Sequence, residues 1–131
     1  MAQNATELFV QFVYSLELSY DSLLEREGEL KLEFAAILEQ NGGEFVHFEE
    51  MGDTMRVQCM FAQYEEELFH DICDDLAPLM DGFVEARLLF VDKDMETLHI
   101  FTVCNGAWQE SCLRLPTSGP LGRALLEKNG K

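Results

Sequence analysis

The chain has 131 residues, and its 25 Asp and Glu outnumber 9 Lys and Arg, which gives a formal net charge of −16 at pH 7. Apolar residues make up 47% of the sequence, a fraction too high for a disordered acidic tail and suited to one compact domain over residues 1–131. Unaided nucleic-acid binding is disfavoured, because such proteins neutralise phosphates with Lys and Arg. No run approaches the roughly 20 uncharged apolar residues of a membrane span, and the N-terminus lacks the pattern of a signal peptide.

The charge is distributed unevenly along the chain. Residues 1–50 and 51–96 each carry a net charge of −9, whereas residues 97–131 carry +2. Self-repulsion at this charge opposes compactness and favours solubility, and a cationic partner would relieve it. The charge is therefore a first, general indication of a partner with a basic surface.

Residues 6–27 fit two patterns of secondary structure. Apolar residues recur there at helical spacing, but the first half of the segment also alternates as a strand would. The length favours a helix, whereas the aromatic and β-branched residues at its start favour a strand. We predict a helix that is interrupted at Gly28. Residues 29–38 show the same two patterns, and both interpretations stay open there.

Two β-hairpins are predicted further along the chain. Residues 45–50 and 55–61 form the first, joined by a turn that contains Gly and Asp, and residues 83–91 and 97–104 form the second. Both hairpins favour an antiparallel sheet.

A helix is predicted between the hairpins over residues 64–80, followed after the second hairpin by a strand at 108–115 and a short helix at 119–128. The order of elements predicts an α+β fold, a mainly antiparallel sheet built from hairpins with helices packed on one face. In element order and size the chain is similar to roadblock-type and ferredoxin-like domains and to the small chaperones of type III secretion, and it shares the acidity of the last group.

The most informative local feature is the segment 64–81. On a helical wheel its apolar residues share one arc, which would pack on the sheet, and its polar residues share the other. The polar arc would hold five carboxylates and one imidazole within about three turns. We predict a docking face for a Lys- and Arg-rich surface, and the alternative is a solvated face that only keeps the protein in solution. The residues of this acidic helix face are Glu66, Glu67, His70, Asp71, Asp74 and Asp75.

Partial matches to metal sites fail on their spacing. Glu67 and His70 have the ExxH spacing of di-iron carboxylate sites, but such sites need two of these motifs. Asp92, Asp94 and Glu96 match the start of a calcium loop, but the Gly and Glu required further along are missing. We therefore predict no metal and no cofactor, and we favour a function without catalysis.

Two histidines and the single tryptophan are candidates for less specific roles. His47 and His99 fall in predicted strands, where a general base is conceivable but a structural histidine is the commoner case. Trp108 is expected at the edge of the core, with a role as a partner anchor as the alternative.

The cysteines are scattered singly, without a CxxC pair. Zinc-ribbon and thioredoxin-like sites are therefore not indicated, and reduced thiols in the cytoplasm are expected. Cys59 and Cys104 alternate with apolar neighbours, so both are predicted as small core residues. The full set is Cys59, Cys73, Cys104 and Cys112.

Three functions follow from these observations. We favour a cytoplasmic protein-binding adaptor, chaperone-like or regulatory module, which binds a basic protein and forms a homodimer through a bare sheet edge or face. The first alternative is a nucleic-acid mimic that inhibits a basic DNA- or RNA-binding protein. The second is a small enzyme, which would need a pocket that holds His47, His99 or a cysteine beside an acid with a perturbed pKa.

Overall fold

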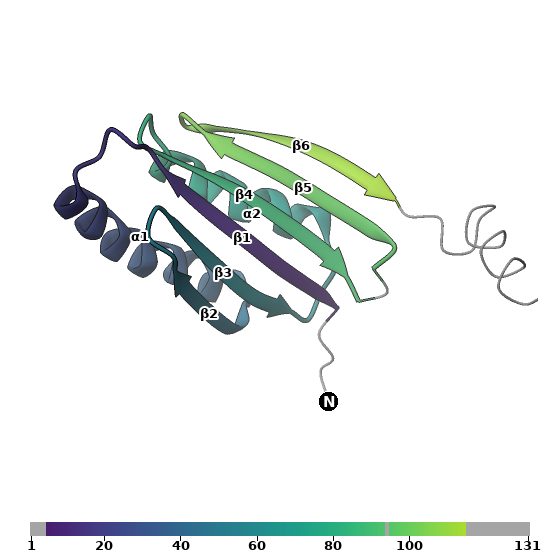
Figure 1. The fold of residues 1–131 in the computed structure, drawn as a ribbon. Coiled ribbons are helices and arrows are strands. Elements are labelled where there is room, and N and C mark those ends of the chain that lie inside the picture. The colour runs from purple at the N-terminus through teal and green to yellow at the C-terminus, as the bar shows by residue number, and fades with distance from the viewer. Residues whose placement is uncertain (1–4, 94, 115–131) are drawn as a thin grey trace, which may run out of the picture.

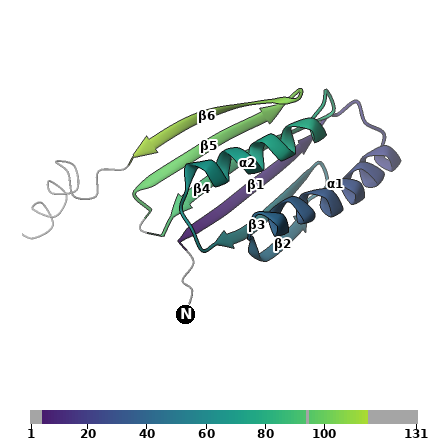
Figure 2. The same cartoon turned by 180° about the vertical axis from the view of Figure 1, so that it is seen from behind.

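The computed structural model describes residues 5–93 and 95–114 of the chain. These residues form one six-stranded antiparallel sheet with two α-helices on the same face, which confirms the predicted α+β fold (Figure 1 and Figure 2). The elements are β1 (Thr6–Tyr14), α1 (Tyr20–Gln40), β2 (Glu44–Glu50), β3 (Thr54–Phe61), α2 (Glu66–Leu76), the 3-10 helix η1 (Ala77–Leu79), β4 (Val84–Asp92), β5 (Thr97–Cys104) and β6 (Ala107–Arg114).

The first strand lies in the middle of the sheet, between the two hairpins. The strand order is β2-β3-β1-β4-β5-β6, and β1 pairs with β3 on one side and with β4 on the other. Strands β2 and β6 form the two edges. Hairpins distant in sequence are thereby joined into one sheet through hydrogen bonds to β1.

The predicted helix over residues 6–27 is wrong at its start, where residues 6–14 form β1 and α1 begins only at Tyr20. Alternate side chains of β1 face the helices and are at most 3% exposed, while Phe9 and Val13 lie half-buried on the opposite face. Because apolar side chains lie on both faces of this strand, they also satisfy helical spacing, and this explains the error. The buried residues are Thr6, Leu8, Val10, Phe12 and Tyr14.

Gly28 does not interrupt a helix, because α1 continues through it to Gln40. The Oγ atom of Ser19 caps the start of α1 by accepting a hydrogen bond from the Ser22 backbone N–H at 3.2 Å. Residues 29–38 are therefore helical, and the larger side chains of their buried side include Leu30 and Phe34. The cost of one mid-helix glycine, about 1 kcal/mol, is offset by this apolar burial.

The later elements agree with prediction to within a few residues. Both hairpins and the strand at β6 are confirmed, and the helix over 64–80 appears as α2 followed by η1. The predicted helix at 119–128 lies outside the described residues. Because the observed order begins with a strand, it differs from the helix-first order on which the similarity to other small domains was based.

The core lies between the helices and the face of the sheet that they cover. Phe34 of α1 meets Phe12 edge-on with ring centroids 5.1 Å apart, and Phe69 of α2 stacks on Phe90 at 4.1 Å. Cys59 belongs to this core as predicted. Cys104 does not, because it lies half-buried on the other face. We call this second face, which no described helix covers and which is turned toward the viewer in Figure 1, the open face.

One carboxylate is buried where α1 meets the sheet. Glu27 is 4% exposed and lies near the Tyr14 hydroxyl and the Glu50 carboxylate. Burial raises the pKa of Glu27, and the negative charge of Glu50 raises it further, although the Tyr14 hydroxyl and Lys31 act in the opposite direction. The ionised form of Glu27 is therefore disfavoured in the folded state.

Replacing Glu27 by glutamine should stabilise the fold near neutral pH. A carboxyl with a raised folded-state pKa lowers stability as the pH rises above its ordinary value of 4.5, and Glu27→Gln removes that loss. Urea unfolding at pH 7 should show a gain of about 1 kcal/mol, the scale of relieving an unfavourable buried charge. At pH 4 the gain should nearly vanish. A variant that is less stable than the parent at pH 7 would contradict this account.

Candidate functional site

Helix α2 packs its apolar side on the sheet, as its sequence pattern predicted. Phe69, Ile72, Cys73 and Leu76 are buried without measurable exposure. The helix contacts β5 and β6 as well as η1. Its remaining side chains divide between an inner side, next to the edge strand β6, and an outer side toward solvent.

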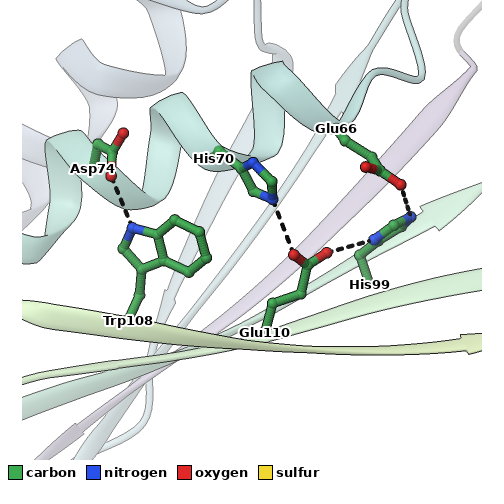
Figure 3. A network of polar contacts seen from close by, with 6 residues as sticks. All are labelled: Glu66, His70, Asp74, His99, Trp108 and Glu110. Atoms are coloured by element: carbon green, nitrogen blue, oxygen red, sulfur yellow. Dashed lines mark hydrogen bonds and ion pairs between the residues drawn. The ribbon is translucent and has the colours of Figure 1, made fainter.

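The inner side forms a polar cluster with the last two strands, which we call the α2–β6 cluster (Figure 3). The α2 residues recur at every fourth position, so they line up on one side of the helix. The residues from β6 alternate along the strand and therefore share its helix-facing side. The members are Glu66, His70 and Asp74 from α2, His99 from β5, and Trp108 and Glu110 from β6.

At the centre of the cluster, the Glu110 carboxylate lies between two imidazoles. Its Oε1 atom is 3.0 Å from Nε2 of His70, and its Oε2 atom is 2.9 Å from Nδ1 of His99. His99 is 2% exposed and packs against the ring of Phe69 at 5.2 Å. The other ring nitrogen of His99 is 3.9 Å from the Glu66 carboxylate. One acid thus joins the helix to β5 and β6.

Trp108 makes the second link between α2 and β6. Its indole N–H donates a hydrogen bond to Oδ1 of Asp74 at 2.8 Å. The indole ring stacks on His70 with centroids 5.0 Å apart and an interplanar angle of 25°. It also meets Phe101 edge-on at 5.5 Å. Trp108 therefore lies at the edge of the core, as expected, and fixes the position of the helix.

The Glu110 carboxyl remains ionised in this setting. Burial acts to raise its pKa, but the hydrogen bonds with His99 and His70 and the charges of these rings outweigh burial and hold the pKa below its usual range. A carboxylate between two imidazoles can share or exchange protons with them. Among the described residues, no group of three or more His, Cys, Asp or Glu has a geometry suited to a metal ion.

The structure divides the predicted acidic helix face in two. Glu66, His70 and Asp74 belong to the α2–β6 cluster. The other three residues are exposed and form no ion pair with a described residue. They recur at every fourth position, about 6 Å apart along the axis. We call this set, Glu67, Asp71 and Asp75, the outer acidic row.

Sequence reasoning missed the partners of the inner residues. Glu110 could have been suspected, because it alternates with Trp108 and Cys112 and so occupies a helix-facing position of a strand. Its two histidine contacts could not have been read from spacing, since they depend on how α2 crosses β5 and β6. His47 takes no part in the cluster and is exposed on the edge strand β2.

Comparison with known proteins adds no assignment. No protein-family model matches the chain, and no curated protein matches it. Within residues 5–93 and 95–114, neither helix is long and apolar enough to cross a membrane.

Replacing Glu110 by glutamine should loosen the attachment of α2. Since the pKa of Glu110 is lowered in the fold, its contribution is complete above its ordinary value of 4.5 and disappears as the pH falls through the lowered folded-state value. We expect Glu110→Gln to cost about 1–2 kcal/mol in urea unfolding at pH 7, the range for hydrogen bonds to charged groups discounted for partial exposure.

A suitable control is Glu7→Gln, which alters an exposed glutamate on another strand and should change stability by less than about 0.5 kcal/mol. If the cost of Glu110→Gln stayed constant from pH 7 to below its folded-state pKa, the loss would come from packing and not from the ionised carboxylate.

Proposed function

We propose that this protein is a protein-binding module that docks a partner with a basic surface on the outer acidic row. The proposal is carried by one observation: three acids recur along one side of α2, exposed and without ion pairs to described residues. Neighbouring acids about 6 Å apart lie within a Debye length at physiological salt, so their repulsion is only partly screened. Lys or Arg side chains from a partner would relieve it.

The α2–β6 cluster supports this role by holding the helix in place. His70 and Asp74 point inward, where they contact Glu110 and Trp108 respectively. The residues that follow them in the sequence, Asp71 and Asp75, are exposed on the outer side. A helix fixed by these contacts presents its acids in a set arrangement before a partner arrives. Binding then costs less conformational entropy than it would on a loose helix.

A charge-neutralised variant tests the proposal. Glu67→Gln, Asp71→Asn and Asp75→Asn together keep side-chain size and remove three charges, and they should slightly stabilise α2 by ending like-charge repulsion. Basic proteins retained from a native-host extract by the parent should be lost with this triple variant. For a partner so identified, calorimetry should show Kd weakened at least about tenfold.

Helix α1 offers a matched control. Glu25, Glu29 and Glu33 are exposed and have the same spacing, so replacing all three by glutamine removes an equal charge elsewhere on the molecule. This control should change Kd less than about twofold. Equal loss with both triple variants would show that total charge matters and that the outer acidic row is not a specific site. Displacement of the partner by duplex DNA would identify it as a nucleic-acid-binding protein.

The compartment and the oligomeric state belong to the same proposal. Four unpaired thiols, two of them in the buried Cys59 and Cys73, support a reducing compartment such as the cytoplasm. A homodimer would form where β2 or β6 offers an unpaired edge to a second copy. Sedimentation equilibrium should then yield twice the 15.0 kDa chain mass, whereas a monomer at about 100 µM would count against the homodimer.

A further inference from the structure

The open face of the sheet has a hollow with a volume of about 370 Å³. Its lining residues belong to the neighbouring strands β3, β1, β4 and β5, on the side of the sheet opposite to α1 and α2. The strands form its floor, and no described element covers it from outside. Its side chains come from Phe9, Gln11, Arg56, Gln58, Arg87, Leu89 and Ile100.

Strand register arranges these side chains in two rows. Gln11 is paired with both Arg56 and Arg87, so one polar row crosses the three central strands with Gln11 in its middle. Two residues along, about 7 Å away, Phe9 pairs with Leu89, which in turn pairs with Ile100. The hollow therefore has an apolar row beside a row with two positive charges.

The two arginines of the hollow have no acidic partner among the described residues, although the chain has a large excess of acid. Arg26 and Lys31 are each paired with a carboxylate, at 2.8 Å and 2.6 Å. Arg56 and Arg87 are exposed and form no ion pair with any described residue. Glu49 is opposite Arg56 in the register without forming such a pair, and no carboxylate lines the hollow.

Charge and shape decide what can occupy the hollow. A two-fold related second copy centred there would bring Arg56 and Arg87 against the same two arginines, which disfavours a homodimer through this hollow. A nucleic acid would be repelled by the net charge of −16. Small-molecule sites enclose most of the ligand surface. The hollow has a floor of strands and no described element above it, so it would leave a small molecule largely exposed.

We propose that the hollow binds an extended segment of a partner protein in which carboxylates alternate with apolar side chains. The segment would run across the strands between the two rows, so that its alternate side chains reach the arginine row on one side and the apolar row on the other. Its carboxylates pair with Arg56 and Arg87, whose guanidinium groups suit bidentate contact with carboxylates. The apolar side chains of the segment pack on Phe9, Leu89 and Ile100. This surface goes beyond the proposed function, because it takes the opposite charge from the outer acidic row and lies on the other side of the sheet. The protein is then an adaptor that can hold two partners at once.

Fluorescence polarisation with a labelled nine-residue peptide of alternating Glu and Leu tests the proposal. The peptide should bind saturably to the full chain and more weakly as salt rises. The comparison peptides are measured on the chain with the outer acidic row neutralised, because that row is itself proposed to bind Lys side chains. On this variant, a peptide with Lys in place of Glu, and one with Ser in place of Leu, should each bind at least tenfold more weakly than the Glu–Leu peptide. Absence of saturable binding of the Glu–Leu peptide up to about 1 mM, or equal binding of the Lys peptide to this variant, would overturn the proposal.

Protein variants locate the binding site. Arg87→Glu should weaken binding of the Glu–Leu peptide at least tenfold. Ile100→Thr removes apolar surface but keeps a side chain that suits a strand, and it should weaken binding at least threefold. Lys93→Glu is the matched control, since it reverses one charge in the turn after β4, outside the hollow, and it should alter Kd less than twofold. Equal effects of Arg87→Glu and Lys93→Glu would overturn the assignment.

Two further results separate this proposal from others. Neutralising the outer acidic row should leave binding of the Glu–Leu peptide within twofold of the parent, so that each surface can fail without the other. Sedimentation of the parent and of Arg87→Glu should show the same oligomeric state. A dimer that only Arg87→Glu dissociates would mean that a second copy occupies the hollow, and would overturn the proposal.

Discussion

The pairing of β1 with both neighbouring hairpins is the interaction on which the rest of the structure depends. This strand forms hydrogen bonds with β3 on one side and β4 on the other, and each of its faces carries apolar side chains. One face receives the helices and forms the core. The other brings Gln11 between Arg56 and Arg87, so the two arginines flank a single position although they lie far apart in sequence.

Two helices on the same side leave the molecule with two unlike surfaces. The helix side carries many exposed acids of a chain whose net charge is −16. Some acids of α2 contact other residues of the protein, and the others face solvent. The open face carries half-buried apolar side chains and two arginines without ion pairs to described residues, and its glutamates Glu7, Glu49 and Glu85 lie outside the hollow. Because the sheet separates the two surfaces, the binding proposed at one would leave the other accessible to a second partner.

The parts of the fold that depend on local pattern could be predicted from the sequence. The amphipathic character of α2 and both hairpins follow from spacing and turn residues, and these predictions are confirmed. The pattern of residues 6–14 predicts a helix wrongly, because apolar side chains on both faces of a strand also satisfy helical spacing. Gly28 does not interrupt α1, because tertiary packing of the helix overrides the preference of a single residue.

The candidate sites depend on contacts that spacing cannot reveal. The acidic residues of α2 were identified from the helical wheel, but their division into two sets needed the position of Trp108 and Glu110 on β6. The sequence does not indicate the hollow, because the hollow requires the sheet order that places β1 between β3 and β4.

The most direct test of the two-surface account is NMR chemical-shift mapping of the labelled chain with a Lys-rich peptide and, separately, with the Glu–Leu peptide. The account predicts that the first shifts amides around Asp71 and the second shifts amides around Gln11; perturbation of one common set of residues by both peptides would contradict it.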